Sequence, residues 1–265
     1  MTEKKRKPYL LTQEGAVAII SINYPPWNRM TLEFIDKLER LIPKLAKDKS
    51  VRAIVLTAED EENFSVGMDL KQMAQKGSNR KVLQDLLDQR LRVERAIETM
   101  GKPVIATLFG YCLGGGLEIP LACHFRLAAE EGAKIGLPEM DLGTVPAWGG
   151  STRLTRCVGR TYALDMILRG RKISGPEAYR IGLVTEVVPN KELKNRAIEL
   201  GKELAEMPAL AVSEMVRCIV GYEDQSLQEG LYQERQAVLN TVGTKDSMEG
   251  NLAFLQKRKP KFNQP

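Results

Sequence analysis

The stretch GYCLGGGLEIPLACH, residues 110–124, decides how the rest of this chain is interpreted. It follows Val104–Leu108, an apolar segment that we predict to be a buried strand, and it runs into a short predicted helix. Its three consecutive glycines let backbone N–H groups approach a ligand closely, and the positive end of a helix stabilises negative charge that develops nearby. Such an arrangement can form an oxyanion hole for an enolate. A glycine triplet alone, however, more often marks a tight strand-to-helix turn.

Two further glycine-containing loops favour a ligand site over an isolated turn. Residues 64–70, FSVGMDL, come after the apolar strand candidate Val51–Thr57. Residues 137–150, LPEMDLGTVPAWGG, place the carboxylate of Glu139 beside a proline. The chain has neither a G-x-G-x-x-G pattern nor the G-K-[S/T] ending of a nucleotide-triphosphate loop, so neither of those sites is indicated.

These three loops resemble the signature segments of the crotonase (enoyl-CoA hydratase/isomerase) family. The family's first oxyanion segment reads F-[S/C/A]-[A/S]-G-x-D-[L/I], which residues 64–70 match except at Val66. Its second segment, G-x-[A/C]-x-G-G-G-x-E, matches residues 110–118. Its third, P-E-x-x-[L/I]-G-x-x-P-x-x-G-G, matches residues 138–150. Several ordered motifs of this kind make chance agreement an inadequate explanation.

The resemblance covers nearly the whole chain, from about residue 9 to residues 254–262, and includes a later family pattern at residues 170–184. Strand-like and helix-like segments alternate through the first two-thirds, which predicts an α/β core with parallel strand pairs. The last third is nearly all predicted helix. We therefore expect a crotonase-like, ββα-type superhelical core over residues 1–190. Residues 191–265 are expected to form a helical C-terminal region that serves in trimerisation or as a lid.

The composition limits the chemistry. The chain of 265 residues is 43% hydrophobic and 28% charged, which is ordinary for a globular protein. Its one histidine, His124, is interpreted as structural, so acid/base work falls to carboxylates rather than to a Ser-His-Asp triad or a multi-histidine metal site. The four cysteines lack C-x-x-C spacing and are expected to be buried, reduced thiols. The basic start, Met1–Lys7, precedes no apolar signal core and no run spans a bilayer, which indicates the cytoplasm and no membrane contact.

For catalysis, the resemblance implies roles at four positions. In the family's hydratases, two backbone N–H groups hold the thioester oxygen, and the matching positions here are Met68 and Gly115. The family's two glutamates are both present, as Glu118 and Glu139. By the resemblance, Glu118 orients and activates water, whereas Glu139 exchanges a proton with the α-carbon of the substrate.

The resemblance also implies an acyl-CoA substrate, with coenzyme A as part of the substrate, no prosthetic group and no metal. A neighbouring subunit of a homotrimer, or of a hexamer built as a dimer of trimers, is expected to add Phe254 and Lys257 near adenine and the 3′-phosphate. Met68, which is large for its position, and Trp148 suggest an apolar pocket that limits the acyl group. The positions expected to receive coenzyme A within the same chain are Pro26, Trp27, Asn28, Arg29, Ser65, Val66 and Met68.

The leading hypothesis is reversible hydration of a 2-enoyl-CoA to a 3-hydroxyacyl-CoA, in fatty acid or aromatic acid metabolism. Other reactions on the same scaffold are hydration of a cyclic alkenoyl- or dienoyl-CoA, double-bond isomerisation, decarboxylation and thioester hydrolysis. Retention of both glutamates favours water chemistry and argues against a catalytically silent scaffold. Some family members bind RNA through lysines of an early helix. Interleaved acidic residues nevertheless favour an ordinary solvated face, and so no nucleic acid partner, for Lys37, Arg40, Lys44 and Lys47.

Overall fold

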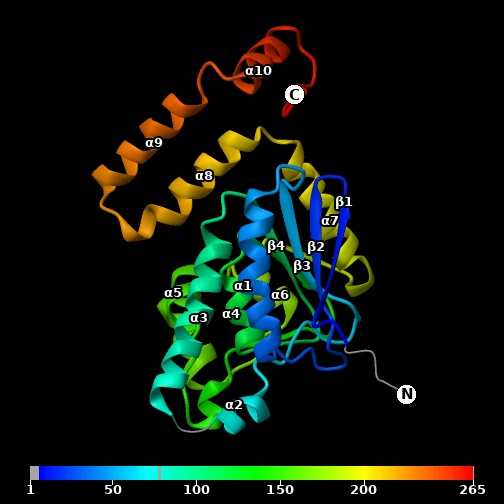
Figure 1. Ribbon diagram of the computed structural model, residues 1–265, viewed down its shortest axis with the longest axis vertical. Coiled ribbons are helices and arrows are strands. Elements are labelled where there is room, and N and C mark those ends of the chain that lie inside the picture. Colours follow the sequence, from blue (N-terminus) through cyan, green and yellow to red (C-terminus); the bar gives the residue numbers. More distant parts are fainter. Residues whose placement is uncertain (1–5, 77–78, 265) are drawn as a thin grey trace.

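A six-stranded sheet in the order β1-β2-β3-β4-β6-β8 forms the centre of the protein, for which a computed structural model describes residues 6–76 and 79–264 (Figure 1). The first five residues of the basic start lie outside the described part. β1 and β2 form an antiparallel hairpin, and all other neighbouring strands of this sheet are parallel. The strands are β1 (Tyr9–Glu14), β2 (Val17–Ile22), β3 (Ala53–Ala58), β4 (Val104–Leu108), β6 (Phe125–Ala129) and β8 (Glu186–Val188).

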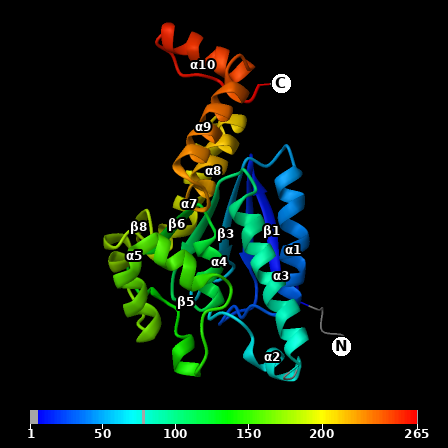
Figure 2. The same cartoon turned by 90° about the vertical axis from the view of Figure 1, so that its left-hand side faces the viewer.

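Helices cover both faces of this sheet. α1 (Leu32–Lys47) and α3 (Arg80–Glu98) lie on one face, and α7 (Asn190–Glu206) lies on the other, where it packs on β2, β3, β4, β6 and β8 (Figures 1 and 2). Thr31 caps the start of α1, because its side chain accepts a hydrogen bond from the Phe34 amide at 3.1 Å. Covering both faces explains why every residue of β2 and β3 is buried. The prediction of an α/β core with parallel strand pairs is confirmed.

A second, two-stranded sheet ties together the loops that carry the signature segments. It pairs β5 (Tyr111–Leu113) with β7 (Lys134–Gly136) in parallel. An isolated bridge between Ser65 and Cys112 then fastens the segment 64–70 to β5. Gly110 makes this close approach possible, since a Cβ there would lie 1.8 Å from the Glu62 carbonyl oxygen. The remaining elements around these loops are α2 (Leu70–Lys76), α4 (Gly115–Leu121), η1 (Glu139–Leu142), α5 (Gly150–Leu168) and α6 (Gly175–Arg180).

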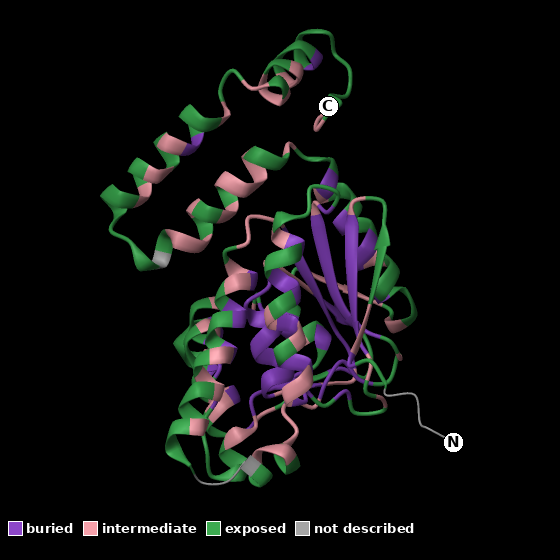
Figure 3. Cartoon of the chain, viewed as in Figure 1, coloured by how far each residue is buried: buried purple, intermediate pink, exposed green. Residues whose placement is uncertain are grey.

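Beyond Pro208 the chain leaves the core and forms an arm, which we define as α8 (Ala209–Gly221), η2 (Tyr222–Asp224), α9 (Leu227–Thr241) and α10 (Lys245–Leu255). α8 and α9 pack side by side, and α10 lies at the far end (Figures 1 and 2). Burial is concentrated in the sheet and the helices around it, whereas the arm is largely exposed (Figure 3). The C-terminal portion is therefore helical, as predicted. However, α7 packs on the sheet, so the projecting part begins after this helix.

Two expectations from composition can be compared with the described residues. Cys112 and Cys123 are buried free thiols, as expected, whereas Cys157 and Cys218 are only half-buried. Within residues 6–76 and 79–264, no helix is long and apolar enough to cross a membrane.

Candidate active site

A cavity of about 340 Å³ lies between α2, α3, α4 and the segment 138–148. All three signature segments contribute to its wall, so residues far apart in the sequence meet at one place. Its lining includes Gly67, Met68, Arg90, Gly115, Glu118, Glu139 and Trp148, and most of the remainder is apolar. Within the described chain, no group of three or more His, Cys, Asp or Glu residues is placed to hold a metal ion.

Two backbone N–H groups at this cavity lack an acceptor. Every amide from residue 64 to residue 69 donates to a protein oxygen except that of Met68, for which the described chain supplies none. Gly115 is the first residue of α4, where a helix offers no internal acceptor for the amide. The two segments are in contact here, because a Cβ on Gly67 would lie 3.2 Å from the Gly115 nitrogen. These are the two amides predicted for the oxyanion hole.

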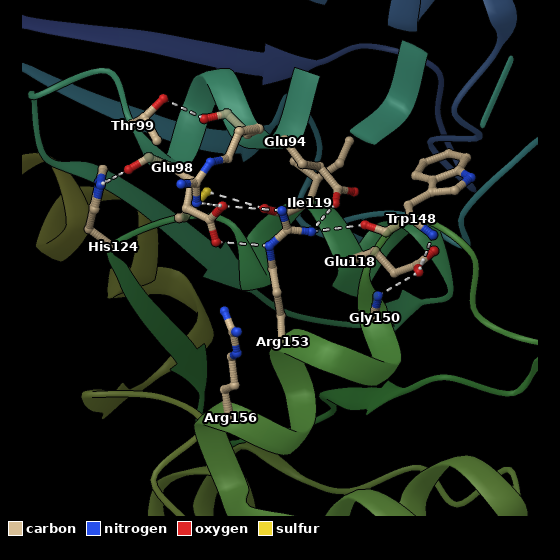
Figure 4. A network of polar contacts seen from close by, with 12 residues as sticks. Glu94, Glu98, Thr99, Glu118, Ile119, His124, Trp148, Gly150, Arg153 and Arg156 are labelled. Carbon is tan, nitrogen blue, oxygen red and sulfur yellow. Dashed lines mark hydrogen bonds and ion pairs between the residues drawn. The ribbon is translucent and has the colours of Figure 1, made fainter. Parts of the chain in front are cut away.

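Glu118 is held rigidly at the wall of the cavity and is only 2% exposed. Its Oε1 accepts hydrogen bonds from the amides of Trp148 at 2.8 Å and Gly150 at 3.0 Å (Figure 4). Oε2 receives no donor from the described residues. Burial raises the pKa of Glu118 to about 7, with a further rise from the negative charge of Glu139, although the two backbone hydrogen bonds and Arg153 oppose the change. Both protonation states are therefore accessible near neutral pH.

Glu139 begins the short helix η1 on another side of the same cavity. Its Oε2 is buried and has no hydrogen-bond partner. A side chain at Gly114 would collide with it, since a Cβ there would lie 2.8 Å from Glu139 Oε1. Burial also raises the pKa of Glu139. The cavity thus contains two carboxyl groups, each with an oxygen that none of the described residues engages by a hydrogen bond.

A network of ion pairs behind the cavity fixes the loop that holds Glu118. Arg153 donates to the Trp148 carbonyl oxygen at 3.0 Å and to Glu98 Oε1 at 2.9 Å, and it also pairs with the buried Glu94 (Figure 4). Because the Trp148 carbonyl is held, the amide of the same residue stays directed at Glu118. The sequence analysis did not identify this network. Its only sequence signal is a pair of acidic residues, Glu94 and Glu98, one turn apart in α3.

The apolar pocket predicted from Met68 and Trp148 is present, but the charged side chain of Arg90 also lines it. Trp148 is only 3% exposed, and its ring packs so closely on Gly115 that a Cβ there would lie 2.4 Å from Cζ3 of the indole. Met68 lines the same wall, as expected. Arg90 also lines it, is 1% exposed, and lies with its guanidinium 5.1 Å from the centre of the Trp148 ring. The sequence analysis missed this cation, although it interrupts an apolar face of α3 that includes Val93 and Ile97.

The segment predicted to receive coenzyme A borders the first oxyanion segment. Asn28 is fully buried, and its Nδ2 donates to Asn63 O at 2.7 Å. Ser65 Oγ donates to Asn28 O at 2.7 Å. These two residues, which were predicted to receive coenzyme A, therefore hold the loop in place. Val66 joins the same connection, because its amide donates to Trp27 O at 3.0 Å. The exposed side chains of this loop are those of Pro26, Trp27 and Arg29.

Other predicted residues lie away from this cavity. Phe254, which is 82% exposed, and Lys257 lie at the end of α10 in the arm, far from α3 and α4 of the same chain (Figure 1). The basic residues of α1 do not line the cavity either, and Lys37 is paired with Glu33 at 2.9 Å. Any contact of Phe254 or Lys257 with a ligand in this cavity would therefore have to come from another copy of the chain.

Comparisons with known proteins agree with this geometry. A family model described as enoyl-CoA hydratase/isomerase matches residues 12–265. A Bacillus subtilis (strain 168) protein named probable enoyl-CoA hydratase is 35% identical over 95% of this chain and 97% of its own length. The short-chain-enoyl-CoA hydratase of Clostridium acetobutylicum is 33% identical over 94% of this chain and 95% of its own length. The crystal structure of an enoyl-CoA hydratase from Bacillus anthracis superposes with a TM-score of 0.91 at 34% identity, covering 97% of this chain and 99% of that chain.

Proposed function

The chain belongs to the enoyl-CoA hydratase/isomerase (crotonase) family, and on that premise we propose that it adds water reversibly to a 2-enoyl-CoA, giving a 3-hydroxyacyl-CoA. The observation that carries this proposal is the pair Glu118 and Glu139, which line one cavity beside two unengaged amides. Two carboxyl groups with free oxygens suit a reaction that moves one proton from water and another to carbon. Coenzyme A enters as part of the substrate, and no step below needs a prosthetic group.

In the proposed reaction the thioester oxygen accepts hydrogen bonds from the amides of Met68 and Gly115. Glu118 takes a proton from water, whose oxygen bonds to C3 of the substrate, and the electrons of the double bond move toward the thioester oxygen. The two amides stabilise the resulting enolate, an interaction for which loss of one donor typically costs about 2.7–4 kcal/mol of barrier. Glu139 then delivers a proton to C2. A proton must return from Glu118 to Glu139 before the next turnover.

The raised pKa values of both glutamates support proton exchange by this pair near neutral pH. Hydration starts with Glu118 ionised and Glu139 protonated, so the active pair holds a single proton. Burial raises both pKa values, and the charge of Glu139 further raises that of Glu118 to about 7. Moving a proton between two carboxyl groups with raised pKa values costs little free energy in either direction near neutral pH. This property suits a reversible reaction.

The proposed reaction predicts that purified protein consumes crotonyl-CoA. The measurement is loss of enoyl absorbance together with detection of 3-hydroxybutyryl-CoA by mass spectrometry. A panel containing a cyclic dienoyl-CoA, a 3-enoyl-CoA and longer or substituted 2-enoyl-CoA thioesters separates hydration from isomerisation and from hydrolysis. Conversion of the 3-enoyl-CoA without hydration of any 2-enoyl-CoA would identify an isomerase and overturn the proposal.

We also propose that the protein is a homotrimer or a dimer of trimers in which the arm joins subunits. The arm exposes many large apolar side chains that its own chain leaves uncovered, more than isolated helices in water normally show. They include Leu210, Met215, Ile219, Leu227, Leu231, Leu239, Leu252 and Phe254. Under this proposal, the arm is the part of the expected C-terminal region 191–265 that serves in assembly, and Phe254 and Lys257 reach the coenzyme A of a neighbouring subunit.

Light scattering at micromolar concentration is expected to give three or six times the chain mass of 29.6 kDa. Phe254→Ala and Lys257→Ala are expected to raise KM for crotonyl-CoA while changing kcat little, because both would contact the nucleotide rather than the reacting atoms. Lys259→Ala, an exposed lysine two residues away, is the matched control. A monomer, or unchanged KM in both variants, contradicts the cross-subunit contact.

A further inference from the structure

One charged group in the cavity has no role in the proposed hydration. We propose that Arg90 binds a second carboxylate at the far end of the acyl group, so that the preferred substrate is a short 2-enoyl-CoA whose acyl chain ends in a carboxylate. This inference rests on the proposed function, because it assigns a substrate class to the same cavity.

The contacts of Arg90 leave its guanidinium without an anion. Nη1 donates to Leu86 O at 2.7 Å, one turn earlier in α3. Nη2 contacts only the sulfur of Met68, at 4.0 Å, and Nε is buried without an acceptor. An arginine side chain remains protonated in proteins, even though burial lowers the pKa of Arg90. Among the described residues, no carboxylate lies within ion-pair distance of this buried cation.

Two acidic residues could be expected to pair with Arg90, one because its charge acts on Arg90 and one because it lies one turn away in the same helix. Both are engaged elsewhere. Asp36, whose charge acts on Arg90 over distance, accepts a hydrogen bond from Gln89 at 2.8 Å. Glu94, one turn further along α3, pairs with Arg153. A buried cation left unpaired in this way is costly, and in proteins such groups are normally paired or serve a ligand.

The two donors without an oxygen acceptor, Nε and Nη2, lie on the same edge of the guanidinium. This edge matches the two oxygens of a carboxylate, which arginine commonly binds through two parallel hydrogen bonds. The polar contact of Nη2 within the described part of the chain is with the thioether of Met68, an unbranched and adaptable side chain that a carboxylate can displace. Since Nε is buried in this structure, a carboxylate would reach both donors of this edge once the Met68 side chain has moved aside.

The neighbours of Arg90 place its Nε–Nη2 edge near the groups that are proposed to hold the reacting end of the substrate. The guanidinium lies over the Trp148 ring, and that ring packs on Gly115. Met68, which supplies the other unengaged amide, contacts Arg90 through its sulfur. An acyl group held by these two amides therefore starts beside the side chains that adjoin Arg90. Arg90 is the one cationic side chain among the described residues that line the cavity.

Stacking on Trp148 alone does not account for an arginine at this position. A methionine could cover the indole ring without burying a charge, and it would leave no unsatisfied Nε. The contact does, however, hold the guanidinium over the ring, which limits the positions that its unpaired edge can take. We therefore interpret the contact with Trp148 as positioning for ligand binding.

Binding of unreactive thioesters tests this inference without relying on turnover. Wild-type protein is expected to bind glutaryl-CoA at least ten-fold more tightly than the neutral pentanoyl-CoA in calorimetric titrations. Arg90→Met should weaken glutaryl-CoA binding by on the order of 10²-fold and leave pentanoyl-CoA binding unchanged or improved. Arg92→Met, an exposed arginine of the same helix that pairs with Glu39, is the matched control and should change neither. Equal losses for both ligands in Arg90→Met, with a native circular dichroism spectrum, would show a packing role and overturn the inference.

Kinetics then separate the two proposals. We expect kcat/KM for 4-carboxybut-2-enoyl-CoA to exceed that for the neutral 2-pentenoyl-CoA, and Arg90→Met to reverse this preference, mainly through KM for the carboxylated substrate. Arg90→Lys should restore part of the preference, because it keeps the charge but not the planar fork. If wild-type protein hydrates both substrates without preference, the carboxylate site is wrong and the hydratase stands. If glutaryl-CoA binds through Arg90 but no enoyl-CoA is hydrated, the site stands and the proposed reaction is wrong.

Discussion

Glu118→Gln and Glu139→Gln are each expected to lower kcat for hydration by roughly 10²–10⁴-fold, the contribution of one general acid or base. An amide has nearly the shape of a carboxyl group but can neither take the proton of water nor deliver one to C2. Since neither glutamate is assigned a contact with the coenzyme A portion, acyl-CoA binding should remain within a few-fold of wild type. The loss should therefore fall on kcat and not on KM.

The pH profile gives a second readout of the same pair. Glu118 must be ionised to act as base, so wild-type kcat/KM should fall as the pH drops below about 7, where this carboxyl group takes up its proton. Glu139 must hold a proton to deliver it to C2, so wild-type kcat/KM should also fall at higher pH as this carboxyl group ionises, and this alkaline limb should be absent from the residual activity of Glu139→Gln.

Glu206→Gln, at the exposed end of α7, is the matched control and should leave both kcat and the pH profile unchanged. Hydration at a near-normal rate by either active-site variant would remove that residue from the mechanism. An alkaline limb that persists in Glu139→Gln would show instead that a group other than Glu139 supplies the proton to C2.

The strands of the core could be predicted closely because their signal is local. Val104–Leu108 was predicted with the bounds that the structure gives, and the predicted strand Val51–Thr57 overlaps the observed strand Ala53–Ala58, since each is a short apolar run. The strands β5 and β7 were missed. Each has three residues, too few for a period, and each exists only because the loops meet in space.

The residues of the candidate site show the same contrast between local sequence signals, which could be predicted, and features that arise only in the fold, which could not. Glu118, Glu139, Met68 and Gly115 were predicted from motifs, and the structure places all four around one cavity. His124 was read as structural, and its Nδ1 accepts a hydrogen bond from the Val104 amide at 3.0 Å.

Arg90 was missed because a charged residue on a helix is ordinarily solvated, and nothing in the sequence shows that α3 turns this one inward. Glu94 and Arg153 were missed for the same reason, since only the packing of α3 against the start of α5 makes them partners. Burial of a charge is a tertiary property.

Gly67→Ala is expected to lower kcat by roughly 10²–10³-fold, the loss typical of removing one oxyanion-hole donor. Gly67 has φ of +87°, and a Cβ there would lie 2.6 Å from Leu113 O and 3.2 Å from the Gly115 nitrogen. The added methyl group would therefore lodge between the segment 64–70 and the start of α4. Because Met68 follows Gly67 directly, separating these segments would move the two proposed donor amides apart.

The strain of a positive φ must be distinguished from the displacement of the amides. Gly132→Ala is the matched control, because Gly132 has φ of +77° and an added Cβ would meet nothing within 4 Å. Both variants should lose some thermal stability, since alanine is disfavoured at positive φ. Only Gly67→Ala should lose turnover, and the loss should fall on kcat more than on KM, because the amides act on charge that develops in the enolate. A folded Gly67→Ala variant with wild-type kcat would show that the amides of Met68 and Gly115 do not form the oxyanion hole.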